Sequence, residues 1–171
     1  SFIVLDTVQR ERFRTDGYIV IDDFKSSDEI ARLRSRAQEI VDAFDPAEVH
    51  VFTTEDQAEK SDAYFLTSGD KVCCFFEQEA FDAQGHLRQS KDLSINKIGH
   101  AMHDLDPVFD ALPRGARLGA IAVDLDPAQP LLYQSMYIFK QPSIGGAVNW
   151  HQDASFFQTD PPTVTTFWFA L

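Results

Sequence analysis

The sequence predicts an α+β fold with a mainly β core, in which helices and short strands (residues 1–129) precede an antiparallel β body that begins near residue 130. Capped amphipathic patterns typical of helices occupy much of the first part. Three β-rich runs, separated by turns rich in proline and glycine, follow residue 130. Because 171 residues suffice for one sizeable core and no repeat divides them, residues 1–171 are expected to form a single domain.

The chain begins with a predicted short helix and strand. Residues 6–16 carry apolar side chains among charged ones, with Asp6 or Thr7 as the N-cap, and glycine follows directly at position 17. The β-branched and aromatic stretch "YIVID", 18–22, then predicts a strand.

A second helix is predicted over residues 24–44. Ser26 or Ser27 is the expected N-cap, and Asp28 and Glu29 complement the positive end of the helix dipole. The apolar residues at helical spacing are Ile30, Leu33, Ala37, Ile40, Val41 and Phe44. Their periodicity indicates that one face of this helix is buried.

Short elements are expected in the middle of the chain. The pattern predicts a loop at 47–62, strands at 63–70 and 71–77, a turn at 82–86, and helices at 94–105, 106–114 and 116–125. The two strands are separated by a Ser-Gly-Asp turn, and the helix at 94–105 would begin at Ser94 as N-cap. The helix at 106–114 has proline in its first turn, where proline is tolerated.

The β body consists of the runs "LLYQSMYIFKQ" (131–141), "AVNWHQDASFF" (147–157) and "TVTTFWFAL" (163–171). The last run stops within an apolar strand pattern, which would leave a sheet edge and an apolar face exposed. We therefore expect these residues to be the front part of a longer fold.

Composition excludes some classes of partner. A net charge of −12 and a pI of about 4.6 disfavour nucleic acid and anionic membrane surfaces, which require clustered cations. No apolar run reaches the ~18 residues of a membrane span, and the N-terminal stretch lacks the features of a secretory signal. Cys73 and Cys74 are adjacent and rarely bridge in that arrangement, so they are expected to be small strand residues, which fits a cytoplasmic location.

His151 and Asp153 are the candidate metal ligands. In a strand, residues two apart point to the same face, so these side chains would present a nitrogen and an oxygen side by side. This pair is two-thirds of the two-histidine, one-carboxylate facial triad of non-haem Fe(II) oxygenases. A histidine paired with a neighbouring aspartate for structural reasons would give the same pattern. The aromatic neighbours Trp150, Phe156 and Phe157 are expected to help exclude water.

The motifs around this pair resemble the phytanoyl-CoA dioxygenase family. They are "INKIGHAMH", "DPVF", "QSMYIFKQP" and "HQDASF", with "DGYIVIDDF" and "FLTSGDK" nearer the N-terminus. The resemblance covers essentially the whole chain and is densest from Asn96 to Phe157. It implies a double-stranded β-helix (a jelly roll, cupin-like) behind a helical N-terminal part. It also implies an Fe(II)- and 2-oxoglutarate-dependent dioxygenase that uses O₂ to hydroxylate a small organic substrate, releasing succinate and CO₂.

The resemblance assigns roles to individual residues. His151 and Asp153 match the first two iron ligands, and Lys97, Met136 and Trp168 match positions that line the 2-oxoglutarate pocket, although the loop before Trp168 differs in length. Gln152, between the ligands, is expected to contact the co-substrate through its backbone. From the residues alone, other roles stay open: a solvated helix-face lysine at 97, and core packing for the methionine and the tryptophan.

Two parts of the family's site have no match in the sequence. The family takes a second histidine ligand and a carboxylate-clamping arginine from later strands, yet no histidine or arginine follows Asp153. His100 and His103, three apart, could share a metal, but structural roles are expected. The alternative function is a catalytically silent module that binds 2-oxoglutarate or metal. The presence of Asp153 disfavours halogenation, because the halogenating relatives replace this carboxylate.

Overall fold

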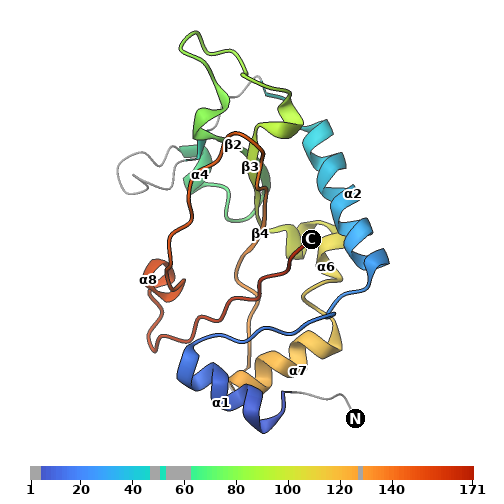
Figure 1. Ribbon diagram of the computed structural model, residues 1–171, viewed down its shortest axis with the longest axis vertical. Coiled ribbons are helices and arrows are strands. Elements are labelled where there is room, and N and C mark those ends of the chain that lie inside the picture. The colour runs from blue at the N-terminus through green and yellow to red at the C-terminus, as the bar shows by residue number, and fades with distance from the viewer. Residues whose placement is uncertain (1–4, 47–50, 53–62, 127–128) are drawn as a thin grey trace.

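The computed structural model describes residues 5–46, 51–52, 63–126 and 129–171 (Figure 1). Its helices are α1 (Thr7–Asp16), α2 (Ser27–Ala43), α4 (Ala63–Leu66), α5 (Met102–Leu105), α6 (Pro107–Asp110), α7 (Ala116–Leu125) and α8 (Ala154–Phe157). Its strands are β1 (Val51–Phe52), β2 (Val72–Glu77), β3 (Ile95–His100) and β4 (Ser135–Ile138), and short 3-10 helices occupy Gln78–Ala80 and Lys91–Leu93. Within these ranges, no helix is long and apolar enough to cross a membrane.

The first two predicted helices are confirmed, together with their caps. Asp6 accepts a hydrogen bond from the Gln9 backbone, and the Gln9 side chain bonds back to the Asp6 backbone, so that α1 begins with a complete capping box. Ser26 and Glu29 form the same arrangement at the start of α2. α1 ends at Gly17, whose positive φ of 80° is accessible to glycine at little cost.

The four strands form one sheet in the order β1-β2-β3-β4. β1 pairs with β2 in parallel, whereas β2, β3 and β4 are antiparallel neighbours. Lys97 pairs with Phe75 on one side and Ile138 on the other, so these three side chains share one face of the sheet. Ile98 pairs with Cys74 and Tyr137, which share the other face.

The hydrophobic core lies between α2 and the face of Ile98 (Figure 1). Its buried members are Leu33, Ala37, Val41, Cys74, Phe76, Ala80, Ile95, Ile98, Met102 and Phe109. The predicted apolar stripe of α2 therefore supplies its contact with the sheet. Cys73 and Cys74 are free and buried, as expected for small strand residues, and burial raises the pKa of the Cys74 thiol to about 12.

The predicted helix at 94–105 is wrong for its first half, because residues 95–100 form the central strand β3. The register of β3 shifts where Phe75 pairs with Lys97 and Phe76 pairs with Ile95. This irregularity lets Ile95 and Ile98 both reach the core, although they are three residues apart. A spacing that imitates a helix therefore arises here from a β-bulge.

Two predicted strands in the first half are also wrong. Residues 63–66 form α4, where the Tyr64 hydroxyl donates to the Cys74 carbonyl at 3.2 Å and the Phe65 ring packs against Phe75. This packing against β2 outweighs the β propensity of the sequence. Residues 18–21 have no regular secondary structure, Asp22 lies in a turn, and Val20 is exposed, so the described chain has no strand here. The loop predicted at 47–62 lies outside the described residues except for 51–52, which form β1 instead. The turns at 68–70 and 82–86 and the helices α6 and α7 are confirmed.

Of the three β-rich runs after residue 130, only the first contains a strand, β4. Residues 147–157 form an irregular segment and α8, and residues 163–171 have no strand partner among the described residues. The predicted antiparallel body after residue 130 is therefore represented by β4 alone, because the other three strands of the sheet lie before residue 130, and a double-stranded β-helix is not shown.

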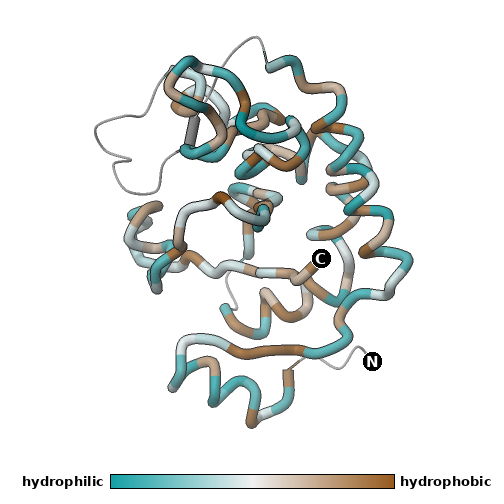
Figure 2. Tube along the Cα trace, turned by 45° about the horizontal axis from the view of Figure 1, so that its top comes forward, coloured by the Kyte–Doolittle hydropathy of each residue, from teal (hydrophilic) through white to brown (hydrophobic). Residues whose placement is uncertain are grey.

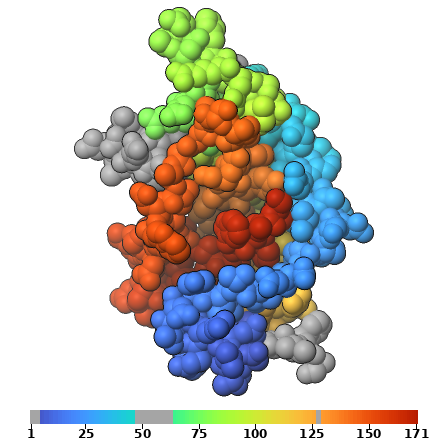
Figure 3. All heavy atoms as spheres, in the orientation of Figure 1, coloured from blue at the N-terminus to red at the C-terminus, as the bar shows by residue number. Residues whose placement is uncertain are grey.

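Contacts with the N-terminal half hold the C-terminal segment (Figure 3). The Phe24 ring lies 5.9 Å from that of Phe169, and the Arg117 guanidinium stacks on Phe24 at 4.2 Å. The apolar stretch 18–22, brown in Figure 2, runs just before Phe24 in this part of the molecule. α1 is tied to α7 by the Arg10–Asp124 ion pair, at 2.8 Å.

Candidate functional site

Lys97 is a buried cation on the central strand. Lys97 is only 4% exposed, and the ring centroids of Phe65 and Phe75 lie 5.1 and 5.5 Å from its Nζ. Burial lowers the pKa of Lys97 to about 7 because the ammonium loses hydration. The alternative of a solvated lysine on a helix is therefore wrong.

Met136 lies beside Lys97 on the neighbouring strand β4. Its sulfur is 3.8 Å from the lysine Nζ, and the residue is 45% exposed, so filling the described core does not account for it. The antiparallel register, in which Met136 pairs with Gly99, puts both side chains on the same face. The structure thus brings together two residues that are 39 positions apart in the sequence.

His100 and His103 have separate structural partners. His100 is buried against Phe65 and Phe75, and its Nδ1 lies 2.8 Å from the Ser68 hydroxyl. Burial, and then the nearby charge of Lys97, lower the pKa of His100 to about 4, so this imidazole is neutral near pH 7. His103 instead contacts Ser135. No cluster of three or more potential metal ligands occurs in the described part of the chain.

His151 and Asp153 do lie side by side, although not on a strand. They precede α8 in an irregular segment, where His151 Nε2 is 3.3 Å from Asp153 Oδ1. The strand geometry predicted for them is therefore wrong, whereas the predicted proximity is confirmed. The turn that begins α8 brings the two side chains together.

Hydrogen bonds orient both members of this pair. His151 Nδ1 lies 2.7 Å from the Asn149 carbonyl oxygen, which can only accept, so Nδ1 carries the hydrogen. In the neutral imidazole, Nε2 then presents its lone pair to a carboxylate oxygen. Two electron-rich atoms at that separation repel unless a proton or a metal cation lies between them. The other Asp153 oxygen accepts a hydrogen bond from the Thr166 hydroxyl.

The remaining predicted residues lie on the surface of the described structure. Gln152 is exposed, and its carbonyl accepts hydrogen bonds from Ser155 at the start of α8. Trp168 is 79% exposed, so it is not a core residue of the described chain. Trp150 is 99% exposed and Phe156 is 57% exposed. Within the described residues these two rings therefore do not shield the site from water, and that expectation is wrong there.

Sequence reasoning missed several side chains that shape these two pairs. Phe65 and Phe75 line Lys97, whereas Asn149 and Thr166 orient the His151–Asp153 pair. No local pattern in the sequence links Thr166 to Asp153, because the two residues are 13 positions apart.

The chain belongs to the phytanoyl-CoA dioxygenase (PhyH) family, whose profile matches residues 13–171. It is 45% identical over 163 residues to a protein of Arabidopsis thaliana named phytanoyl-CoA dioxygenase, a match that covers 95% of this chain and 58% of the relative. It is also 43% identical over 174 residues to the phytanoyl-CoA dioxygenase domain-containing protein 1 of Bos taurus, covering 98% of this chain and 60% of that relative. The chain therefore spans less than two thirds of the length of these curated relatives.

Proposed function

We propose that this chain forms part of an Fe(II)- and 2-oxoglutarate-dependent dioxygenase that hydroxylates a small organic substrate with O₂ and releases succinate and CO₂. Membership of a family whose members are named dioxygenases supports the reaction class. The observation that carries the proposal is the position of His151 Nε2, 3.3 Å from Asp153 Oδ1, with Nδ1 held by the Asn149 carbonyl.

The donor atoms of this pair fit a ferrous ion. A neutral imidazole nitrogen and a carboxylate oxygen are two of the three protein ligands in the facial triad, and their mutual repulsion is relieved by a cation. Thr166 holds the second carboxylate oxygen, which limits rotation of Asp153. When bound, iron would supply open coordination positions at which dioxygen is activated. We propose that the third ligand, a histidine, comes from outside the described residues.

Lys97 would bind a carboxylate of 2-oxoglutarate. An ammonium with little access to water interacts more strongly with an anion than a solvated one does. Burial lowers its pKa to about 7, and a bound carboxylate would favour the charged form. Met136 and the phenylalanine rings would exclude water from this contact. Roles for Trp168 and the Gln152 backbone at the same co-substrate, and completion of the sheet as a double-stranded β-helix, belong to this proposal.

The test is Fe(II)-dependent formation of succinate from 2-oxoglutarate by the full-length protein. We expect turnover that Asp153→Ala abolishes. Asp124→Ala is the control and should largely retain turnover, because Asp124 pairs with Arg10 instead. An iron-loaded preparation whose turnover does not exceed that of Asp153→Ala, with a panel of candidate substrates present, would refute the oxygenase. Retained binding of 2-oxoglutarate in that preparation would favour the silent binding module.

A further inference from the structure

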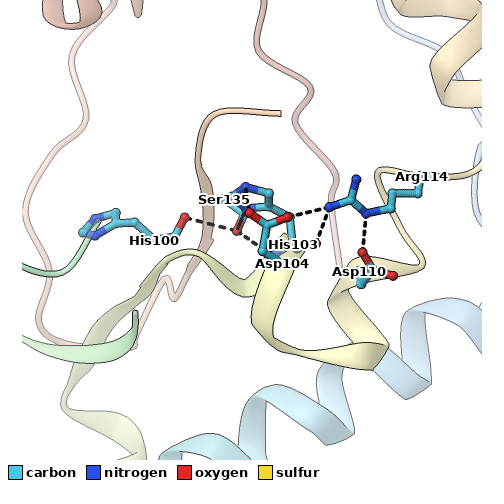
Figure 4. Close-up of polar contacts among 6 residues, drawn as sticks. All are labelled: His100, His103, Asp104, Asp110, Arg114 and Ser135. Carbon is cyan, nitrogen blue, oxygen red and sulfur yellow. Dashed lines mark hydrogen bonds and ion pairs between the residues drawn. The ribbon is translucent and has the colours of Figure 1, made fainter. Parts of the chain in front are cut away.

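Ser135, the first residue of β4, is fixed by a compact set of hydrogen bonds (Figure 4). Its hydroxyl oxygen lies 3.1 Å from the backbone nitrogen of His103, 2.8 Å from Nδ1 of the same residue and 3.4 Å from the carbonyl oxygen of His100. His103 is 4% exposed, so this contact is shielded from water. One serine thus ties the start of β4 to α5 and to the end of β3.

The directions of these bonds follow from the groups on either side. The His103 backbone N–H donates to the serine oxygen. The hydroxyl has one hydrogen, which can go to the His100 carbonyl at 3.4 Å or to Nδ1 at 2.8 Å, and the shorter contact with Nδ1 leaves the imidazole hydrogen on Nε2. Nε2 faces the Asp104 carboxylate at 3.5 Å, where a hydrogen is favourable and a lone pair is not. Arg114 in turn bonds to Asp104 and to the His103 carbonyl, which holds the ring from outside (Figure 4).

β4 needs such a restraint because its pairing is short. Among the described residues it lies at one edge of the sheet, with β3 as its strand neighbour and only four residues in the ladder. A slip by one residue would move every side chain of β4 to the opposite face of the sheet. At its other end, the Gln141 side chain donates to the carbonyls of Asp92 and Ile95 at 2.9 and 3.2 Å. Side chains therefore hold the strand at both ends.

We propose that Ser135 and His103 are positioning residues that fix the register of β4 and thereby hold Met136 against Lys97. Ser135 precedes Met136 directly, and the 3.8 Å contact between the methionine sulfur and the lysine Nζ depends on where β4 begins. The effect on co-substrate binding rests on the function proposed above. The effect on Met136 itself does not.

The experiment compares Ser135→Ala with Ser135→Thr in the full-length protein. Alanine removes the hydroxyl with little change in volume, whereas threonine retains it. We expect Ser135→Ala to raise the Kd and KM for 2-oxoglutarate on the order of tenfold, with a smaller change in kcat, because displacement of Met136 weakens binding at Lys97. Ser135→Thr should stay near the wild-type values. His103→Asn, which places an amide oxygen near the Nδ1 position, should be milder than His103→Leu.

Ser94→Ala is the matched control for a general loss of stability. Ser94 is buried and donates to the carbonyl of Ser90 at 2.9 Å, but it lies before the start of β3, away from the Lys97–Met136 contact. Ser135 is only structural if Ser135→Ala and Ser94→Ala lower the melting temperature equally and raise the Kd for 2-oxoglutarate equally. It is also only structural if the wild type binds 2-oxoglutarate and neither substitution changes that Kd.

A second readout needs no ligand. Residues 1–171 include two methionines, Met102 and Met136, and in ¹³C-methyl spectra of the full-length protein Met102→Leu and Met136→Leu each assign the signal of the residue that they remove. Ser135→Ala should shift the Met136 signal and leave that of Met102, which is buried in the core, nearly unchanged. An unshifted Met136 signal would overturn the positioning role. If the wild type binds no 2-oxoglutarate, the proposed function fails, and the methyl signal still decides this inference.

Discussion

Replacing Lys97 with methionine should stabilise the fold while abolishing the proposed co-substrate contact. Burial lowers the pKa of Lys97 from 10.5 to about 7. At 1.36 kcal/mol per pKa unit, this shift corresponds to a cost of about 5 kcal/mol for keeping the ammonium in the folded protein. Relaxation of the surroundings makes this value an upper bound. Methionine is similar in size and suits the contact with Phe65 and Phe75.

The pH dependence follows from the direction of this shift. Between pH 7 and pH 10.5 the unfolded chain holds the lysine proton and the folded protein does not, so stability rises with pH across this window. The destabilisation by Lys97 is fully present below pH 7 and is lost as the pH approaches 10.5. The advantage of Lys97→Met should therefore be largest at pH 6 to 7 and should shrink towards pH 10, on the order of several kcal/mol overall.

Urea unfolding followed by circular dichroism, at several pH values between 6 and 10, measures this difference. Lys140→Met is the control, because Lys140 is exposed and its removal should change the free energy of unfolding by less than about 0.5 kcal/mol at any pH. A Lys97→Met protein that is less stable than wild type at pH 7, or whose advantage does not vary with pH, would refute the conclusion that burial of the Lys97 ammonium destabilises the fold.

Three further predictions concern other parts of the structure. Thr166→Val removes the hydroxyl that holds Asp153, and titration with Fe(II) or a spectroscopic substitute should show affinity about tenfold weaker, whereas unchanged affinity would exclude this support. Asp106→Ala removes both the N-cap of α6 and the partner of Arg36 at 2.7 Å, so chemical denaturation should show a loss of about 2 to 4 kcal/mol; a loss below 1 kcal/mol would contradict the buried network. The Cys74 thiol, with a pKa raised to about 12 by burial, should resist an aromatic disulfide reagent at pH 8 until the protein is unfolded, and fast modification of the native protein would contradict this.

Local signals in the sequence predicted the helices that depend on them. α1, α2 and α6 begin at side chains that cap their first turn, and such caps act within three residues of the chain. β3 was not predictable in this way, because its apolar spacing results from a bulge defined by pairing with β2, more than 15 residues away. The prediction of a strand in place of α4 failed for a related reason, because Phe65 is held by a ring contact with Phe75 rather than by strand pairing.

The candidate site was likewise predictable only in part from the sequence. Lys97 and Met136 were identified because their motifs resemble a family, not because the sequence alone puts them together. His151 and Asp153 were expected side by side, and they are, but through a turn before α8 rather than a strand. The orienting hydrogen bond from Thr166 joins residues 13 positions apart, so only the folded chain reveals it.

The two faces of β3 have a consequence for how this protein can change. Ile98 points into the hydrophobic core, and its neighbour Lys97 points to the proposed binding side. Two adjacent residues therefore serve different purposes, one folding and the other ligand recognition. A substitution that enlarges position 98 must displace the backbone between them, and the ammonium moves with it. Selection for heat resistance and selection for a new co-substrate would therefore act on the same short stretch. Beneficial mutations there should depend strongly on one another, whereas those on the outer surface of α2 should combine freely.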